Sequence, residues 1–591
     1  MKKISISIFL SAFMLVSCQD DFLDLDPQDA ITEAAYFKTP AHFEAASNDF
    51  YNKMISWRPV KGSSIYDFMD FGSDLISLPQ PYGRGVVTVP STDIYWRNAY
   101  EYIRANNILL EKAAEYSGSQ AEIAEYVAAA KFFRAWHHFF LLKRYGGVPV
   151  VTTVVDINSQ VLYGPRNSRY EVMAQILQDL NEAIPNLPIE QNIGTSDKGH
   201  VSKWAAEAFK ARVLLYEATW EKYVGTSTDG DGTTAGAGTA GAGNNIQAYL
   251  QEAVTLAKDV MDNGGYELWN YNNVLNNRSM YYLFNLEDSG SNPASLDKSS
   301  NKEFILASKY DYNLYQGGVN LSHTVGTRLA PSRKFMDMFL SIDGLPIAQS
   351  PLFLGYANTP DEYQNRDYRL LSYFANTATD AAPANGQVTL RGSGADSGSG
   401  YGNRKFAAYR YGSYRAANTE SADYPQIRLA EVYLIYAEAL YELNNGITDA
   451  QLAESVNRIK VRAGLPALTN AFATTNNLNI LQEIRRERAV ELFGENTRFD
   501  DLKRWGIAET ELNAPVYGSV IEGSVYQNNT ALYTPGNYPY GQAPVATGDG
   551  TLSALLLDPA SNRNFARQHY LMPIPLAQIQ LNNNLRQNPG Y

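Results

Sequence analysis

Residues 424–444, YPQIRLAEVYLIYAEALYELN, indicate most clearly how this chain folds. From Ile427 onward the apolar residues recur at steps of three and four, which places them on one face of an α-helix. The stripe consists of Ile427, Ala430, Leu434, Ala437 and Tyr441. The glutamates of the segment lie largely off this stripe, so the pattern predicts a helix that packs inward on one side.

The same periodicity occurs elsewhere in the chain. Trp96–Tyr116 and Gln120–Tyr145 are long helical segments separated only by Ser117-Gly118-Ser119, which predicts a helical hairpin. Further helices are expected at approximately 169–187, 203–223, 246–263, 448–463 and 478–493. Because the helices come in pairs, we expect a mainly α fold whose helix pairs stack like tetratricopeptide units.

Between about 264 and 423 the helical pattern is lost, and Gly, Asn, Asp, Ser and Pro occur together with many Tyr. We expect a long irregular excursion there, with a few short strands such as Glu303–Ala307. Gly225–Asn245 and Thr377–Gly400 are low-complexity stretches, too poor in large apolar side chains to order themselves. Long loops in a compact body are often functional, so the excursion is a candidate binding region.

The composition is that of an ordinary folded protein. The 591 residues are 45% hydrophobic and 19% charged, which is enough for a large core and excludes disorder of the bulk. The net charge is −13 without a cluster of Lys and Arg, so nucleic acid is not expected as a partner. The chain has 41 Tyr, whose flat apolar face and polar tip suit hydrated binding surfaces.

The amino terminus has the features of an export signal. Two lysines precede an apolar run from Ile4 to Val16, which spans roughly 20 Å as a helix and is too short for the ~30 Å hydrocarbon core of a membrane. Residues 1–17 are therefore interpreted as a signal peptide. The only cysteine, Cys18, resembles the lipid-attachment cysteine of bacterial lipoproteins, and the following Gln19-Asp20-Asp21 resembles a surface-export signal. We expect a lipid-anchored protein of the outer membrane, exposed at the cell surface.

Common catalytic motifs are absent from the sequence. It has no phosphate-binding loop, no Gly-x-Ser-x-Gly elbow and no His-Glu-x-x-His helix, and we expect no metal and no cofactor. His137 and His138 are helix neighbours that point about 100° apart, so they are interpreted as packing residues. A carboxylate pair for glycoside hydrolysis stays open, because sequence does not report which acids lie ~5 to 9 Å apart in space.

One charged segment is interpreted as scaffold. Glu487, Arg488 and Glu491 lie at i, i+1 and i+4, so the two glutamates share a helix face and need cationic partners. Arg485 and Arg504 are the candidates for these partners. The pattern predicts a buried ion network rather than a ligand-binding site.

Several segments, in order along the whole chain, resemble the SusD/RagB family of outer-membrane nutrient-binding lipoproteins. They include Trp96-x3-Tyr100-x2-Ile103-x-Ala105-Asn106, Arg144-Tyr145-Gly146-Gly147-Val148-Pro149, Asn365-Arg366-Asp367-x-Arg369, Ile427–Leu434, Asn457-x4-Arg462-Ala463-Gly464-Leu465, Ile484–Leu492, Arg498–Trp505 and Gln587–Tyr591. The resemblance implies one SusD-like α-helical domain over residues 18–591, with four tetratricopeptide-like helix pairs. Its parts are expected at about 20–225 (amino-terminal), 264–423 (loop-rich excursion) and 303–591 (carboxy-terminal).

The resemblance also implies a function without catalysis. A protein of this family captures a nutrient, typically an oligosaccharide, and delivers it to a SusC-type TonB-dependent transporter, which it covers as an extracellular lid. Two alternatives stay open. One is a secreted glycoside hydrolase with paired carboxylates, and the other is a protein that captures a non-glycan nutrient such as a peptide.

Sugar-binding residues are expected in two loop regions, 66–96 and the excursion. Sugars stack their C–H faces on aromatic rings while acids, amides and arginines bond the hydroxyls. Ser73-Asp74 resembles a recurrent Ser-Asp step of the family. Trp96 is equally consistent with a residue that faces a cleft and with the start of a packed helix. The candidate ligand-binding residues are Asp74, Tyr82, Arg84 and Trp96 in the first region and Tyr281, Tyr312 and Arg404 in the second.

Overall fold

The computed structural model describes residues 36–58, 69–225, 245–322, 328–357, 359–375, 398–410, 414–530, 533–544 and 552–591. Cys18, the predicted signal peptide and most of the two low-complexity stretches lie outside the described residues. Within these ranges, no helix combines the length and the apolar character needed to cross a bilayer.

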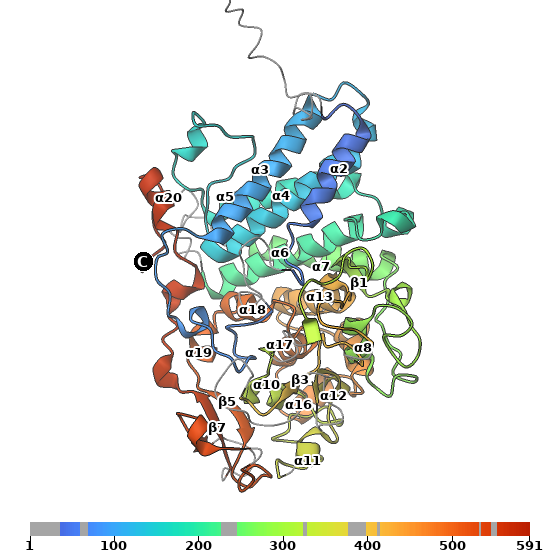
Figure 1. Ribbon diagram of the computed structural model, residues 1–591, viewed down its shortest axis with the longest axis vertical. Helices are drawn as coiled ribbons and strands as arrows, with labels where there is room; N and C mark the ends of the chain where they lie inside the picture. The colour runs from blue at the N-terminus through green and yellow to red at the C-terminus, as the bar shows by residue number, and fades with distance from the viewer. Residues whose placement is uncertain are drawn as a thin grey trace, which may run out of the picture.

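Long helices build the amino-terminal half. They are α2 (Pro40–Tyr51), α3 (Ile94–Ala114), α4 (Ala124–Tyr145), α5 (Arg169–Ala183), α6 (Lys203–Tyr223) and α7 (Ile246–Asn263). Helix α4 packs against α2, α3 and α5, and α6 packs against α7 (Figure 1). The predicted helices at 203–223 and 246–263 have the predicted bounds, and the other three begin or end within four residues of them. The prediction of paired helices is therefore confirmed.

Local signals set several of these helix ends. Helix α5 begins with a capping box, in which the Glu171 N–H donates to the Ser168 hydroxyl and the Ser168 N–H donates to the Glu171 carboxylate. Ser202 caps α6 and Asp93 caps α3 with a side-chain oxygen. Helix α4 ends at Tyr145, and the next residue, Gly146, has a φ of 77°, which glycine adopts readily because it has no Cβ.

The excursion folds into short elements around a second, aromatic core. These elements are α8 (Ser279–Tyr282), β1 (Phe304–Ser308), α10 (Arg333–Met338), α11 (Thr359–Tyr363), α12 (Tyr368–Tyr373), β2 (Phe374–Ala375) and β3 (Gly402–Asn403). Strand β1 confirms the strand expected at 303–307. Trp57 is fully buried in this core, where its indole N–H donates to the Ala422 carbonyl at 2.6 Å.

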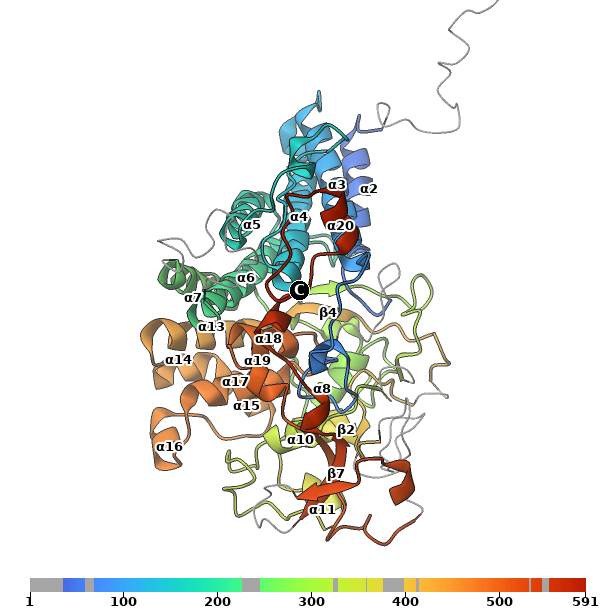
Figure 2. The same cartoon turned by 90° about the vertical axis from the view of Figure 1, so that its left-hand side faces the viewer.

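The carboxy-terminal half contributes residues both to the core between the long helices and to the aromatic core. It contains β4 (Tyr424–Arg428), α13 (Leu429–Asn444), α14 (Asp449–Glu454), α15 (Val456–Arg462), α16 (Asn470–Thr475), α17 (Ile480–Glu491), α18 (Arg498–Arg504), α19 (Ala508–Glu511) and α20 (Leu576–Leu581). A three-stranded antiparallel sheet has the order β5 (Val516–Val520), β7 (Ser553–Asp558), β6 (Gln542–Pro544). Helix α13 packs against both α7 and α17, so helices from the two halves form one body (Figure 2).

Two predicted helices differ from the observed elements. The segment 424–444 begins as strand β4 and becomes helical only at Leu429. Pro425 disfavours a helix at the residue before it, and β4 is held extended by antiparallel pairing with β1. The segment 448–463 forms two helices, α14 and α15, which are separated by the non-helical backbone of Ser455 (φ −127°, ψ −99°).

The predicted ion network around α17 is confirmed. The carboxylate of Glu491 is fully buried and accepts hydrogen bonds from three arginines, Arg369 of α12, Arg428 of β4 and Arg462 of α15. Arg428 and Arg462 also share Glu303, next to β1. The cluster therefore ties elements of the excursion to elements of the carboxy-terminal half.

The partners predicted for this network are wrong. Arg485 pairs with Glu442 at 3.1 Å and Arg504 pairs with Glu438 at 2.6 Å. Arg485 lies two residues before Glu487, which is about 200° around an α-helix, so its side chain leaves on the other side of α17. Glu487 instead binds Arg369 at 2.5 Å.

Candidate functional site

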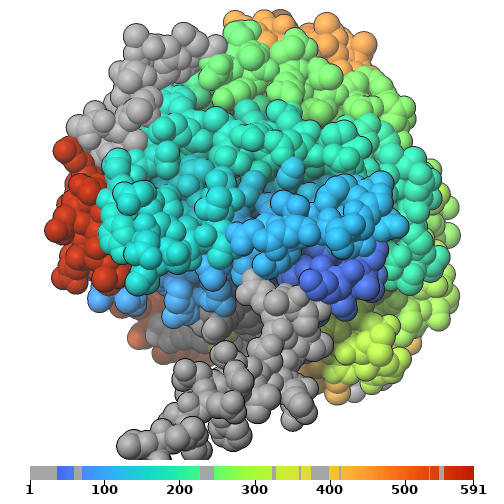
Figure 3. Space-filling model, turned by 90° about the horizontal axis from the view of Figure 1, so that it is seen from above, coloured from blue at the N-terminus to red at the C-terminus, as the bar shows by residue number. Residues whose placement is uncertain are grey.

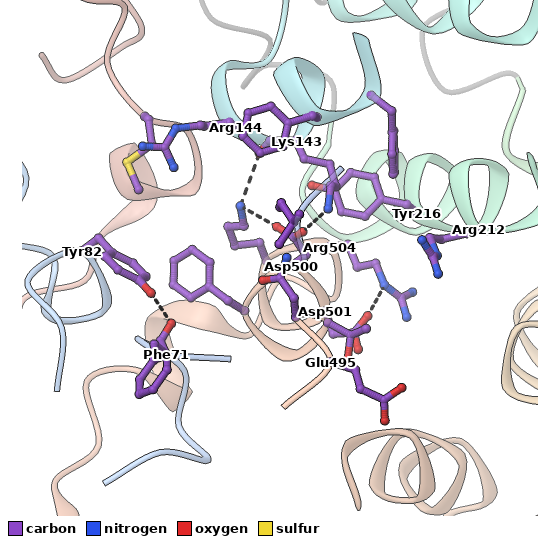
Figure 4. Close-up of a pocket in the computed structure, with 18 of the residues that line it drawn as sticks. Phe71, Tyr82, Lys143, Arg144, Arg212, Tyr216, Glu495, Asp500, Asp501 and Arg504 are labelled. Carbon is purple, nitrogen blue, oxygen red and sulfur yellow. Dashed lines mark hydrogen bonds and ion pairs between the residues drawn. The ribbon is translucent and has the colours of Figure 1, made fainter. Parts of the chain in front are cut away.

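A cavity of about 630 Å³ lies between the amino-terminal helices and the segment around α18. Its walls come from α4 and α6, from the loop at 71–90, from residues 492–504 and from residues 569–573 (Figure 4). The volume falls within the range of roughly 300–1,000 Å³ that is typical of ligand sites.

Aromatic rings form much of the cavity wall. They are Phe71, Tyr82, Trp136, Phe139, Phe140, Phe209, Tyr216, Tyr424, Phe499 and Tyr570. The Tyr82 hydroxyl donates to the Phe71 carbonyl, and the rings of Tyr82 and Phe499 meet edge to face with centroids 5.3 Å apart. The Tyr82 ring is therefore held in place at the cavity, where it can contact the C–H face of a sugar.

A group of three charged side chains lies in the same cavity. Lys143 of α4 and Lys503 of α18 both bind Asp500, with Nζ–Oδ distances of 2.5 Å and 3.0 Å. Burial alone would raise the pKa of Asp500, but the two lysines outweigh it and lower that pKa to about 2. Burial lowers the pKa of Lys503, while Asp500 opposes this change. The group holds two positive charges and one negative charge.

Buried carboxylates fix the loop at 69–74 to the start of α18. Asp70 accepts hydrogen bonds from the backbone N–H groups of Gly494, Thr497 and Arg498. Asp74 is bonded by the Arg498 guanidinium through two hydrogen bonds of 2.9 Å. Burial alone would raise the pKa of Asp74, but Arg498 and Lys334 lower it overall. These bonds hold the wall of the cavity that carries Tyr82.

The four candidates from the first region lie in different environments. Tyr82 lines the cavity, and Asp74 is buried between Arg498 and Lys334. Arg84 pairs with Asp558 of β7 at 2.7 Å and so joins its loop to the three-stranded sheet. Trp96 is buried near the start of α3. The structure thus brings one of the four to the cavity, and the ligand-binding roles of all four stay predictions.

The candidates from the second region are also separated. The Arg404 guanidinium lies over the Tyr281 ring at 4.4 Å, and both side chains are buried in the aromatic core. Tyr312 is different, because it is 42% exposed on the surface of the excursion. Their ligand-binding roles likewise stay predictions.

Tyr312 belongs to an exposed turn at residues 310–315, which we call the tyrosine loop. Asp311 and Tyr315 exchange two backbone hydrogen bonds of 2.9 Å and 2.8 Å, which close the turn. Leu314 and Tyr315 are exposed beside Tyr312, and the buried ring of Tyr310 stacks on Tyr315 with centroids 5.0 Å apart. The turn therefore presents apolar side chains to solvent from a fixed backbone.

A charged side chain packs against the ring of Tyr312. The Arg415 guanidinium lies 4.2 Å from the centre of the Tyr312 ring. Glu287 and Asp288 hold that guanidinium at 2.7 Å and 2.9 Å. Because the arginine is fixed by two acids, one face of the Tyr312 ring is backed by a rigid cation.

Sequence reasoning missed the residues that give these sites their charge. Lys143 and Asp500 are 357 residues apart, and neither stands in a motif for binding. Arg415 lies in the excursion, where the sequence offers no periodicity to place it. Only the family resemblance of Arg498–Trp505 singles out the segment that contains Asp500 and Lys503, and it assigns neither residue a ligand-binding role.

No metal centre is visible in the part of the chain that the structure describes, where no group of three or more His, Cys, Asp or Glu could hold an ion. His137 and His138 are buried as predicted for packing residues. Burial lowers the pKa of His137 to about 3 and that of His138 to about 4, so both are neutral at physiological pH.

Comparisons with known proteins identify similar chains. A sequence model of the SusD family matches residues 289–591, and a model described as "starch-binding associating with outer membrane" matches residues 79–215. A SusD-like protein of Bacteroides ovatus is 25% identical in an alignment 527 residues long, which covers 85% of this chain and 83% of that protein.

Solved structures show the same fold at low sequence identity. A SusD-like carbohydrate binding protein of Bacteroides fragilis has a TM-score of 0.70 at 21% identity and covers 93% of this chain and 100% of its own. A laminarin binding SusD-like protein has a TM-score of 0.57 at 18% identity and covers 94% of this chain and 100% of its own.

Proposed function

Since the chain belongs to the SusD family of carbohydrate-binding proteins, we propose that it captures an oligosaccharide at the cell surface and delivers it to a SusC-type TonB-dependent transporter. In this proposal Cys18, outside the described residues, carries the lipid anchor in the outer membrane. The protein covers the transporter as an extracellular lid and does not hydrolyse the glycan.

The tyrosine loop carries the glycan-binding part of the proposal. Tyr312 offers an exposed ring to a sugar, and Arg415 behind it keeps that ring in place. Stacking of a sugar on such a ring needs no bound metal and no covalent step. The carboxylates of Glu287 and Asp288 are occupied by Arg415, so their role here is support.

Replacing Tyr312 with alanine is expected to weaken glycan binding at least about tenfold, which corresponds to about 1.4 kcal/mol. The measurement is isothermal titration calorimetry with a panel that includes laminarin and starch. Tyr540→Ala is a matched control, because Tyr540 is also 42% exposed but lies in another part of the surface. Binding unchanged by Tyr312→Ala would contradict this role of the loop. New reducing ends in the glycan would instead indicate a glycoside hydrolase.

An exposed apolar surface supports the proposed contact with a transporter. We call it the apolar patch, and it consists of Val86, Val89, Ile157, Leu162, Tyr163, Leu576 and Leu581. Hydrogen bonds hold its segments together, from the Leu576 N–H to the Pro90 carbonyl and from the Asn584 side chain to the Tyr163 carbonyl. Figure 3 shows the carboxy-terminal segment, in red, against the amino-terminal helical layer. Exposed apolar patches of this kind commonly mark contact sites for other proteins.

Leu581→Asp is expected to abolish co-purification of the lipidated protein with its transporter from outer membranes, because a charge in an apolar contact is strongly unfavourable. The matched control is Val461→Asp in α15, since Leu581 is 75% and Val461 66% exposed. Glycan binding should be unchanged in both variants. Retained co-purification of the Leu581→Asp protein would show that the apolar patch is not the transporter contact.

A further inference from the structure

The cavity beside α18 contains a local surplus of positive charge. The amines of Lys143 and Lys503 share the single carboxylate of Asp500, so the group has a net charge of one positive unit. The chain as a whole is acidic, with a net charge of −13. One added anion would neutralise the group without displacing any of its members.

The other cations that line the described part of the cavity each have a carboxylate within 4 Å. The pairs are Arg144 with Asp93, Arg212 with Glu431, Arg428 with Glu495, Arg488 with Asp501 and Arg504 with Glu438. Burial lowers the pKa of His569, another lining residue, so it adds no charge at neutral pH. The unbalanced charge is thus confined to Lys143 and Lys503.

Lys143 is the amine that a ligand can reach. Its side chain is 23% exposed, whereas that of Lys503 is 6% exposed. A lysine ammonium has three N–H donors, and among the described residues that of Lys143 donates only to Asp500. Two donors therefore remain for an oxygen of a ligand.

Aromatic rings stand next to this charged group. The Lys503 Nζ lies 5.0 Å from the centre of the Phe499 ring, and Tyr82 contacts the same ring. In Figure 4 Tyr82 lies at the left of the view and Lys143 and Asp500 lie near its centre, and all three line the cavity. A sugar ring in this space could rest on Phe499 and Tyr82 while an anionic substituent reaches Lys143.

We propose that the cavity binds a sugar residue that bears one negative charge, a carboxylate or a sulfate ester, with its anionic oxygens at Lys143. The tyrosine loop does not line this cavity, so the cavity is a second site. This inference rests on the proposed function in taking the ligand to be part of an oligosaccharide. It adds the ligand class and the residue that selects it.

The test compares acidic glycans with chemically neutralised forms of the same glycans. Oligosaccharides of galacturonate, mannuronate, guluronate and glucuronate are titrated beside their methyl esters, and sulfated galacto-oligosaccharides beside their desulfated forms. At least one acidic member should bind at least about tenfold more tightly than its neutral form. The uronate and sulfate arms show which anion is preferred. Equal binding within every pair would overturn the inference.

Two substitutions of opposite sign make the test specific. Lys143→Met removes the surplus charge and should abolish the preference for the acidic form, whereas Asp500→Asn raises the surplus and should strengthen it. The control is Lys131→Met on the same helix, because Lys131 is also 23% exposed and is paired with a carboxylate, that of Glu182. An acidic preference that survives Lys143→Met, or that Asp500→Asn weakens, would overturn the inference.

The same titrations separate this inference from the proposed function. If neutral glycans bind in a manner that depends on Tyr312 but no acidic form is preferred, only the inference fails. If no glycan of either kind binds, the proposed function fails as well.

Discussion

Glu491→Ala is expected to lower the free energy of unfolding by about 3–5 kcal/mol, or to prevent folding altogether. The carboxylate of Glu491 is bonded by Arg369, Arg428 and Arg462, all of which are buried. Without it, three guanidinium groups remain in the interior with fewer negative charges near them. Removing one partner of a buried ion pair costs more than the pair contributes, because the remaining charge has lost its solvent.

The measurement is chemical denaturation followed by circular dichroism. If Glu491→Ala does not fold, Glu491→Gln keeps the shape of the side chain and removes only its charge. Glu182→Ala is the control, because Glu182 forms a surface ion pair with Lys131 and should cost at most about 1 kcal/mol. A loss below about 1 kcal/mol for both variants of Glu491 would contradict the buried network as a source of stability.

Asp74→Asn is expected to destabilise the protein by about 3 kcal/mol while the folded protein keeps its affinity for glycan. The carboxylate of Asp74 is buried, accepts two hydrogen bonds from Arg498 and contacts Lys334 at 2.5 Å. The amide leaves the buried Arg498 without its main counter-charge. Because Arg498 is the first residue of α18, the substitution weakens the attachment of the loop at 69–74 to that helix.

Two measurements on the same variant separate support from ligand binding. Denaturation gives the change in stability, and calorimetry at a temperature where the variant is folded gives the affinity for glycan. An affinity reduced about tenfold with unchanged stability would contradict the structural role and favour Asp74 as a ligand-binding residue.

The helices could be predicted because their signals are local. The bounds of α6 and α7 follow from apolar residues that recur within one or two turns, together with a capping serine at Ser202 for α6. The prediction was wrong at 424–428, where pairing with β1, more than 100 residues earlier, overrides a periodic pattern. The periodicity of one segment carries no information about a strand partner so far away in the chain.

The candidate sites could be predicted only in part. Tyr312 stood out as an aromatic residue in an irregular region, and it is exposed. Tyr281, as an aromatic ring, and Arg404, as a donor to sugar hydroxyls, stood out in the same region, but they are buried against each other. An aromatic ring in a long loop can anchor the loop or face solvent, and residue type alone does not separate these outcomes.

The sequence by itself determined most of the helical segments, the need for cations around Glu487 and Glu491, and the resemblance to the family, since each depends on residues near one another in the chain. Only the tertiary structure decided that Arg369, Arg428 and Arg462 meet Glu491 and that Lys143 meets Asp500. Electrostatic contacts depend on distance in space and on burial. Both are fixed by the packing of α4, α17 and α18 rather than by the order of the residues.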